Sequence, residues 1–395
     1  MPTIETDAQW RLQLPENFML RRHLPVGGSY WLSERDGDLL LLPRIPDLRK
    51  LYVECTTVCN LRCRTCMRNA WEDGEGTLSM ATFGRLPAGL DALPELRRVV
   101  FAGYGEPLCH PHILDMVRAV RERGLEVTIA SNGLLVDLAL ARELVALGVD
   151  RLVLSMDGAR PETYAGLRGA ALAQVIDGIG FLNEAKARAG SLRPTLAIEF
   201  VALRSNVEEL GELARLAARL DASCVVVSHP LAHSEEMYAQ ALYGHAPARS
   251  WGPGGWPVHS GDWVTWGTLD LPRMHWGAER RCRFVGDRAA VLGWDGGVSP
   301  CYALSHTYSY LALDGVRKRV SRYVVGRLGT WSLAQIWTSE EYARFRSEVR
   351  GFHFPSCPDC DLRATCDLRQ RNEGCWGWNP SCADCLWAQD IVRCP

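Results

Sequence analysis

The stretch KLYVECTTVCNLRCRTC, residues 50–66, decides the fold. It begins with an apolar run at 50–54 that predicts a β-strand, and it continues directly into a loop with Cys59, Cys63 and Cys66. Three thiolates at these spacings can converge on one metal centre from a single loop. Since a four-iron cluster needs four cysteine ligands, such a loop leaves one iron open to another ligand. A zinc knuckle or a group of buried thiols is the alternative.

Outward from this loop, apolar segments alternate with helical patterns as far as residue 228. The expected strands lie at 50–54, 98–102, 126–130, 150–156, 196–203 and 224–228. Continuous apolar runs are expected of parallel strands that are buried on both faces. Six β/α units predict an α/β fold, a partial (β/α)6 TIM-like barrel, with functional residues at the C-terminal ends of its strands.

Helices are expected between these strands, where capping residues mark their ends. One helix covers 111–123 and ends at Gly124, which suits a C-terminal cap. Asp137 is expected to cap a helix that runs to residue 147, and Pro161 suits the first turn of the next helix. Asn206 is expected to cap a helix through residue 220.

Charge and cysteine content narrow the classes of function. The chain has 44 Lys and Arg against 46 Asp and Glu, so it lacks the basic field that favours nucleic acid. No apolar run reaches the roughly 18 residues of a membrane span. Residues 1–15 lack the pattern of an export signal, so we expect a cytoplasmic protein. In that reducing compartment, metal explains 15 cysteines better than disulfides do.

The cysteines fall into two groups that predict the domain organisation. Four lie between Cys55 and Cys66, and nine lie between Cys282 and Cys394. We expect an N-terminal extension at 1–47, a core barrel at 48–230, a Trp-, Pro- and Gly-rich connecting segment at 231–281 and a cysteine-rich domain at 282–395. Cys55, next to the first strand, is expected to be a buried apolar residue and not a ligand.

The spacing Cys59-Asn-Leu-Arg-Cys63-Arg-Thr-Cys66 resembles the signature of the radical S-adenosylmethionine (SAM) superfamily. The resemblance implies a catalytic 4Fe-4S cluster on these three cysteines, with SAM bound to the open iron. It further implies reductive cleavage of SAM to a 5′-deoxyadenosyl radical, which abstracts hydrogen from the substrate. A low-potential donor such as ferredoxin or flavodoxin would supply the electron.

The turns after later strands also resemble this superfamily. Gly105 and Glu106 lie in Gly-Tyr-Gly-Glu-Pro, which resembles the turn that meets the methionine amino group. Ser155 and Asp157 are at positions that bind ribose hydroxyls in related enzymes, and Arg168 is in a segment whose arginine meets the methionine carboxylate. An ordinary turn, a helix cap and a solvated arginine are the alternatives. Thr65 stands where this superfamily usually has an aromatic residue that packs near the adenine of SAM.

The C-terminal cysteines resemble the SPASM extension, which binds auxiliary 4Fe-4S clusters. Following the order of that family, one cluster would take Cys282, Cys301 and Cys375, and the other would take Cys357, Cys360, Cys366 and Cys385. One or two auxiliary clusters are therefore expected, with Cys382 and Cys394 spare or alternative. Gln370 stands where the family has a further cysteine. A single zinc site with free thiols is the alternative.

Further segments resemble the radical maturases associated with tungsten-cofactor oxidoreductases. They include Cys66-Met-Arg-Asn-Ala-Trp-Glu, Cys301-Tyr-Ala-Leu-Ser-His-Thr-Tyr and the final Arg393-Cys394-Pro395. The resemblance implies maturation of a tungstopterin aldehyde-oxidoreductase-type partner, through its polypeptide or its cofactor. A peptide-modifying radical enzyme and a metal-binding scaffold without turnover are the competing hypotheses. His306 and His353 are candidate site residues, although a lone histidine is more often structural.

Overall fold

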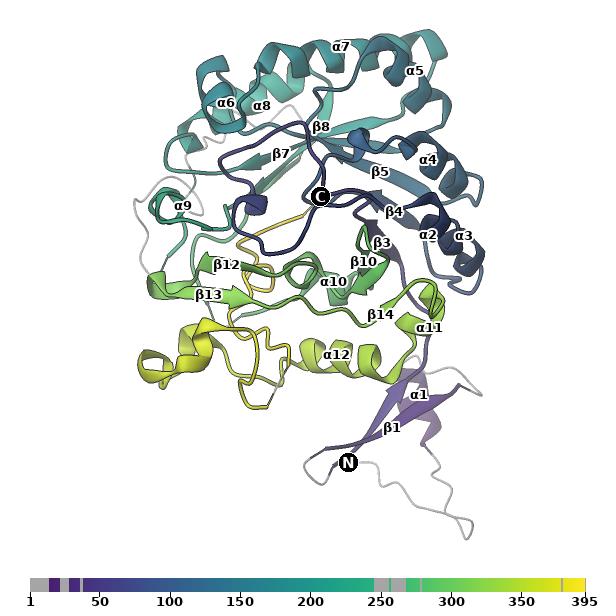
Figure 1. The fold of residues 1–395 in the computed structure, drawn as a ribbon, viewed down its shortest axis with the longest axis vertical. Helices are drawn as coiled ribbons and strands as arrows, with labels where there is room; N and C mark the ends of the chain where they lie inside the picture. Colours follow the sequence, from purple (N-terminus) through teal and green to yellow (C-terminus); the bar gives the residue numbers. More distant parts are fainter. Residues whose placement is uncertain are drawn as a thin grey trace.

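A long, mostly parallel sheet organises the molecule (Figure 1). The computed structural model describes residues 14–21, 28–35, 38–244, 256, 268–277, 279–377 and 379–394, so residues 245–255, 257–267 and 278 of the predicted connecting segment lie outside the described residues. In the described part of the chain, the sheet has ten strands in the order β14-β11-β10-β3-β4-β5-β6-β7-β8-β9. Their bounds are β3 Lys50–Val53, β4 Arg98–Phe101, β5 Glu126–Ser131, β6 Arg151–Ser155, β7 Thr195–Val201, β8 Ala222–Ser228, β9 Thr268–Asp270, β10 Ala289–Leu292, β11 Gly297–Ser299 and β14 Gly326–Arg327.

The predicted α/β fold is confirmed by the six strands β3 to β8. They are neighbours in chain order, and each pair is parallel. Tyr52 pairs with Val100, and Val100 pairs with Thr128, so consecutive strands end at nearly the same level. Both faces of these strands are largely buried, which explains why their sequences are continuous apolar runs.

Helices cover the outer face of these strands (Figure 1). They are α2 Met80–Phe83, α3 Arg85–Leu90, α4 Ile113–Arg121, α5 Leu138–Ala146, α6 Pro161–Arg168, α7 Leu172–Ala189 and α8 Leu210–Arg219. The short helix α9 Glu235–Gln240 follows β8 and lies apart from this layer, toward β12 Tyr308–Leu311 (Figure 1). The Asp137 carboxylate accepts a hydrogen bond from the backbone N–H of Leu140 at 2.7 Å, as a helix cap should. Asn206 does not cap α8, because a 3-10 turn precedes the helix and the Asn206 side chain binds the backbone of Leu203, Asp157 and Val201 instead.

The C-terminal part of the chain continues the same sheet. Strand β10 pairs in parallel with β3, and β11 and β14 then add antiparallel strands. The remaining elements of this part are α10 Arg283–Gly286, β12 Tyr308–Leu311, β13 Arg317–Val320, α11 Leu333–Trp337 and α12 Glu340–Gly351. The sheet therefore runs across the predicted boundary between the barrel and the cysteine-rich domain.

The described N-terminal residues form α1 Glu16–Arg21 and a hairpin of β1 Tyr30–Arg35 and β2 Asp38–Pro43. The Trp31 indole donates to the carbonyl of Thr338 at 2.8 Å, which attaches the hairpin to the end of α11. Searched over the described residues alone, the chain has no helix with the length and apolar character to span a membrane.

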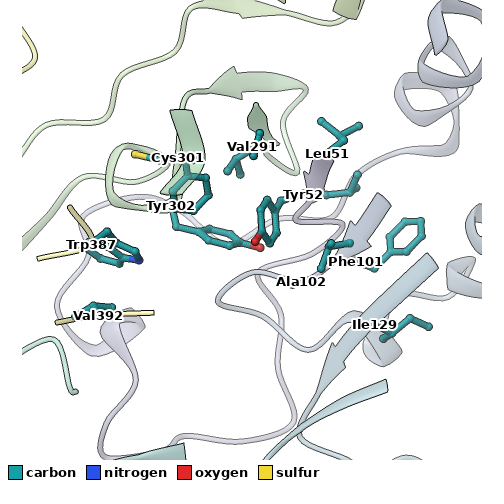
Figure 2. Close-up of a cluster of buried hydrophobic side chains, with 14 of the residues drawn as sticks. Leu51, Tyr52, Phe101, Ala102, Ile129, Val291, Cys301, Tyr302, Trp387 and Val392 are labelled. Atoms are coloured by element: carbon teal, nitrogen blue, oxygen red, sulfur yellow. The ribbon is translucent and has the colours of Figure 1, made fainter. Parts of the chain in front are cut away.

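A single hydrophobic cluster joins the two parts of the chain (Figure 2). It combines Leu51, Phe101 and Ile129 from the parallel strands with Val291, Tyr302 and Trp387 from the C-terminal part. Figure 2 shows Tyr302 between Trp387 and the strand that carries Tyr52, and the rings of the two tyrosines pack edge to face with their centroids 5.0 Å apart. The C-terminal part is therefore packed directly against the strand that precedes the three-cysteine loop.

Candidate active site

A cavity of about 240 Å³ opens at the C-terminal ends of the parallel strands. The strand ends contribute Ser131, Ser155, Glu199, Val201 and Ser228, the three-cysteine loop contributes Cys59, Cys63 and Cys66, and the C-terminal part contributes Tyr302, Trp387, Val392, Arg393 and Cys394. This is the end of an α/β barrel at which ligands bind. The cavity thus lies where the six β/α units predict the functional residues.

The thiols of Cys59, Cys63 and Cys66 all line this cavity, and the backbone around them is well anchored. The N–H of Leu61 donates to the Cys59 sulfur at 3.4 Å, and the Arg68 Nε donates to the Cys66 sulfur at the same distance. Burial raises the pKa of Cys63 to about 11, so metal binding there must displace a proton. Three thiols on one wall fit three of the four ligand positions of a 4Fe-4S cluster.

Elsewhere in the described residues, as in this loop, three Cys, His, Asp or Glu side chains do not close on a single metal ion. The cysteines of a four-iron cluster bind different iron atoms, so they need not approach one another as closely as the ligands of one ion. Cys55 is 1% exposed and is absent from the residues that line the cavity. Its position agrees with the expected apolar role.

The turn at residues 103–107 is fixed against the three-cysteine loop. The Glu106 carboxylate is buried and accepts hydrogen bonds from the backbone N–H groups of Leu108 at 3.0 Å and Asn132 at 2.7 Å. A Cβ atom on Gly105 would lie 2.2 Å from the carbonyl oxygen of Thr56, so only glycine fits there. Glu106 therefore holds the shape of the turn that lines the cavity.

Asp157 and Arg168 form a buried ion pair, and only Arg168 lines the cavity. One Asp157 oxygen accepts from the Arg168 Nε at 2.8 Å, and the other accepts from the N–H of Val201 at 2.9 Å. Burial opposes the charged arginine, but Asp157 outweighs it and the pKa of Arg168 is raised. Asp157 is fully buried and does not line the cavity, so the structure does not bring it to the ribose position that was predicted for it. Asp157 positions Arg168 instead, whereas Ser155 does face the cavity.

Glu199 is a cavity residue that the sequence analysis did not single out. It lies on β7, inside the run LAIEFVAL at 196–203, where a carboxylate interrupts an apolar strand. Burial raises its pKa to about 7, although Arg168 acts in the opposite direction. At neutral pH this carboxyl group can therefore hold or release a proton. The charged residue within an apolar run was the signal that could have found it.

His306 does not line the cavity but connects the C-terminal part to β3. Its Nε2 lies 2.7 Å from a Glu54 oxygen, and its Nδ1 lies 2.8 Å from an Asp73 oxygen. Burial disfavours the imidazolium, but the two carboxylates prevail and raise the pKa of His306 to about 9. The other Glu54 oxygen accepts from the N–H of Tyr104, in the 103–107 turn. His353 is exposed and lies outside the cavity.

Two groups that line the cavity, the Cys394 thiol and the His229 imidazole, are neutral. The Trp387 indole donates to the Cys394 sulfur at 3.1 Å, and burial raises the pKa of Cys394 to about 12. Burial lowers the pKa of His229 to about 3, so this imidazole is neutral. The Tyr302 hydroxyl and His229 Nδ1 are buried and have no hydrogen-bond partner within the described residues. Both are therefore available to a ligand.

Two family models match the chain, over the barrel and over the C-terminal part. Residues 53–217 match the radical SAM superfamily, and residues 282–361 match the iron–sulfur cluster-binding domain called SPASM. The chain belongs to the radical SAM superfamily, within which it is a SPASM-containing enzyme. Membership in these families implies 4Fe-4S clusters and SAM as its cofactors.

One curated relative is similar to this chain over most of its length. The chain is 36% identical over 358 residues to the tungsten-containing aldehyde ferredoxin oxidoreductase cofactor-modifying protein of Pyrococcus furiosus, over 88% of this chain and 97% of that protein. The fold is similar to that of anSMEcpe with bound AdoMet and a Cp18Cys peptide, with a TM-score of 0.54 at 15% identity over 86% of this chain and 95% of that one. It is also similar to Streptococcus suis SuiB bound to its precursor peptide SuiA, with a TM-score of 0.54 at 15% identity over 82% of this chain and 72% of that one.

Proposed function

We propose that this enzyme cleaves SAM in the cavity and uses the radical to modify the cofactor or the polypeptide of a tungsten-containing oxidoreductase. One observation carries the chemical half of this proposal: three thiols, an arginine and a glycine turn face a single cavity at the strand ends. The identity to the Pyrococcus protein over 97% of its length supports the choice of target.

The cavity offers a suitable group for each part of the reaction. Cys59, Cys63 and Cys66 would hold the catalytic cluster, which when bound supplies the electron that cleaves SAM. The turn at Gly105 and Glu106 would meet the amino group of SAM. The Arg168 guanidinium, held in place by Asp157, matches a carboxylate because its N–H groups form a planar fork.

The remaining walls would serve the ribose and the substrate. Ser155 presents a hydroxyl group that can hydrogen-bond to ribose, and Glu199 can exchange a proton near neutral pH. Trp387, Val392 and Tyr302 exclude water from the side that the C-terminal part covers. Exclusion of water strengthens the polar contacts inside the cavity and protects reactive intermediates.

An anaerobic assay tests the SAM cleavage. Reconstituted enzyme reduced with dithionite should form 5′-deoxyadenosine, and the variant Cys59→Ala/Cys63→Ala/Cys66→Ala should form none. Cys55→Ala is the matched control, because this thiol lies outside the cavity and its loss should leave product formation intact. A triple variant that still forms 5′-deoxyadenosine would contradict the assignment. Bound zinc with no product from the unaltered enzyme would favour the scaffold hypothesis.

A second experiment tests the target. We expect 5′-deoxyadenosine formation to rise when immature tungsten oxidoreductase is added, together with ferredoxin or flavodoxin as the cytoplasmic electron donor. Mass spectrometry of the separated cofactor and polypeptide then identifies which of them has changed. Stimulation by short peptides, and none by the oxidoreductase or its cofactor, would instead support a peptide-modifying enzyme.

A further inference from the structure

The buried carboxylate of Glu54 holds the turn at residues 103–107 in place. Its Oε1 accepts a hydrogen bond from the N–H of Tyr104 at 2.9 Å. A Cβ atom on Gly103 would lie 2.7 Å from the same oxygen, so the carboxylate and the backbone of the turn are in direct contact. The turn lines the catalytic cavity, whereas Glu54 does not. Glu54 can therefore act on a ligand in the cavity through the turn and not by contact.

The contact with Glu54 fixes the direction of a carbonyl group as well as that of an N–H group. A peptide unit is planar and trans, so the C=O of Gly103 points away from the N–H of Tyr104. The amino group that this turn is proposed to meet is an ammonium group, which has only hydrogen-bond donors and needs carbonyl oxygens as acceptors. The position of the Glu54 carboxylate therefore decides how the turn presents its acceptors.

His306 is the ion-pair partner of Glu54. In the part of the chain that the structure describes, the Glu54 carboxylate forms one ion pair, with the Nε2 of His306 at 2.7 Å, and both side chains are buried. The Nδ1 of His306 lies 2.8 Å from an Asp73 oxygen, so each ring nitrogen faces a carboxylate and carries a proton. A buried carboxylate without a counter-charge is costly, so loss of His306 should displace Glu54 from its position.

Two aromatic side chains hold the imidazole ring in this orientation. The ring of Trp71 packs on it with the centroids 4.5 Å apart, and the ring of Tyr104 lies edge-on to it at 5.6 Å. Trp71 and Asp73 belong to the segment that follows Cys66, so His306 joins this segment to the turn. Residues of the barrel thus surround a histidine that the C-terminal part supplies.

Backbone hydrogen bonds attach the same C-terminal segment independently of the His306 side chain. The N–H of Glu72 donates to the carbonyl of Thr307 at 2.8 Å, and the N–H of Ser309 donates to the carbonyl of Ala70 at 3.3 Å. Neither bond involves the imidazole. A variant at His306 can therefore keep this segment attached while it changes the support of the turn.

We propose that His306 is a positioning residue for SAM: by holding the Glu54 carboxylate against the N–H of Tyr104, it sets the affinity of the cavity for SAM. The C-terminal part thereby takes part in SAM binding through a residue that does not line the cavity. This inference rests on the proposed binding of SAM at the 103–107 turn and extends it to the residues behind that turn.

The reconstituted variant His306→Gln tests the inference, because glutamine is neutral and leaves Glu54 without its counter-charge. We expect the dissociation constant for SAM, measured by equilibrium dialysis, to rise about tenfold or more, as loss of a hydrogen bond between charged groups does. The iron content should be unchanged. The rate of 5′-deoxyadenosine formation at saturating SAM should also be nearly unchanged, since binding lost equally in the ground and transition states raises KM and not kcat.

A control variant and a rescue variant separate positioning from general stability. Asp47→Ala removes the acceptor of the Trp337 indole, another link between the two parts of the chain, and neither of these residues lines the cavity. This control should bind SAM normally. The double variant Glu54→Gln/His306→Gln carries no uncompensated charge, and Gln can still accept from the N–H of Tyr104. It should therefore bind SAM more tightly than His306→Gln does.

Amide hydrogen exchange in the cluster-free protein gives a readout that needs neither iron nor SAM. The peptide that contains Tyr104 should exchange faster in His306→Gln than in the unaltered chain, because its N–H loses a fixed acceptor. Asp47→Ala should leave this exchange unchanged. Asp73→Ala removes the second acceptor of the imidazole at a partly exposed position, and it should show weaker forms of both effects if His306→Gln does not fold.

The outcomes distinguish this inference from the proposed function. A folded His306→Gln variant that binds SAM as tightly as the unaltered enzyme would overturn the inference and leave the proposed function intact. An equal loss of affinity in Asp47→Ala would also overturn it, because the effect would then belong to the attachment of the C-terminal part as a whole. If the unaltered enzyme bound no SAM, both the proposed function and the inference would fail.

Discussion

The charged side chain of Arg168 is almost completely excluded from water. Its side chain is 11% exposed, and the Asp157 carboxylate that compensates it is completely buried. Removing one partner of a buried ion pair leaves an uncompensated charge, which is far more costly than the loss of an exposed pair. The geometry of the proposed SAM carboxylate site therefore depends on a residue that never reaches the cavity.

The variant Asp157→Asn tests this dependence. We expect it to lower the free energy of unfolding by about 3 kcal/mol, because Arg168 stays buried without its counter-charge. Urea unfolding of the cluster-free protein, followed by circular dichroism, measures the change. Glu212→Gln is the matched control: it breaks an exposed pair with Arg160 and should leave the unfolding midpoint unchanged. Equal effects of the two substitutions would contradict the role of Asp157.

His306 gives the stability of the molecule a defined pH dependence. Its pKa in the folded protein is about 9, against an ordinary value of 6.5. Protonated His306 therefore contributes its full stabilisation of the folded state below about pH 6.5, and this stabilisation is lost as the pH rises through 9. The difference between the two pKa values corresponds to about 3 kcal/mol in the free energy of unfolding. Unfolding measured from pH 6 to 10 should show the decline. The variant His306→Gln should lack it, and a slope that persists in the variant would refute the assignment.

Some of these residues could be predicted from the sequence, and others could not. Cys59, Cys63 and Cys66 belong to one short loop, so their convergence follows from local spacing. His306 and Glu54 lie 252 residues apart, and their contact exists only because β10 pairs with β3. Glu199 looked like part of an apolar strand, and its exposure to a cavity depends on the strands on either side of it.

At the scale of elements, the turn at 103–107 has no room for a larger side chain at Gly105. A Cβ atom on Gly105 would meet the backbone of Thr56 and Thr57, which cannot move without displacing the three-cysteine loop. Two backbone segments in such close contact explain why this position needs glycine. The turn and the loop thus behave as one rigid unit.

Two glycine substitutions provide the test. Gly105→Ala should abolish SAM binding, measured by equilibrium dialysis of the reconstituted protein, because the turn is forced away from the loop. Gly166→Ala, within α6, is the matched control, since a Cβ atom there would meet nothing within 4 Å. It should bind SAM normally and raise stability by about 0.5–1 kcal/mol. Normal binding by the Gly105 variant would contradict the proposed role of the turn.

Some helices and strands could likewise be predicted from local sequence, whereas others depend on packing between distant segments. All six parallel strands follow from apolar runs, and the cap at Asp137 follows from its own turn. The 18-residue helix α7 was not predicted, because two glycines interrupt its pattern. Gly178 lets this helix approach the backbone of Val136, an effect of packing that spacing alone cannot reveal.

On the scale of the whole molecule, one sheet contains strands from both of the segments that match the two family models. β10 covers the free edge of β3, and Tyr302 and Trp387 fill the core behind it (Figure 2). The predicted division into segments at 48–230 and 282–395 remains a statement about sequence families. Physical independence would require a barrel that is stable without the C-terminal strands.

A fragment containing residues 1–281 tests that independence. We expect it to lose stability, because β3 becomes an exposed edge and Glu54 keeps a buried charge without His306. Limited proteolysis should cut the fragment between residues 50 and 66 under conditions in which the full chain is resistant. A resistant fragment that binds SAM would show that the barrel is autonomous.

The parallel pairing of β10 with β3 also orders events during synthesis. At a translation rate of about 5–20 residues per second, the ribosome completes β10 on the order of ten seconds or more after β3 has emerged. Until then the three-cysteine loop next to β3 has no C-terminal wall over it, and its thiols are open to the iron–sulfur delivery machinery. We therefore expect the iron–sulfur cluster to be inserted into the loop most easily before β10 pairs with β3.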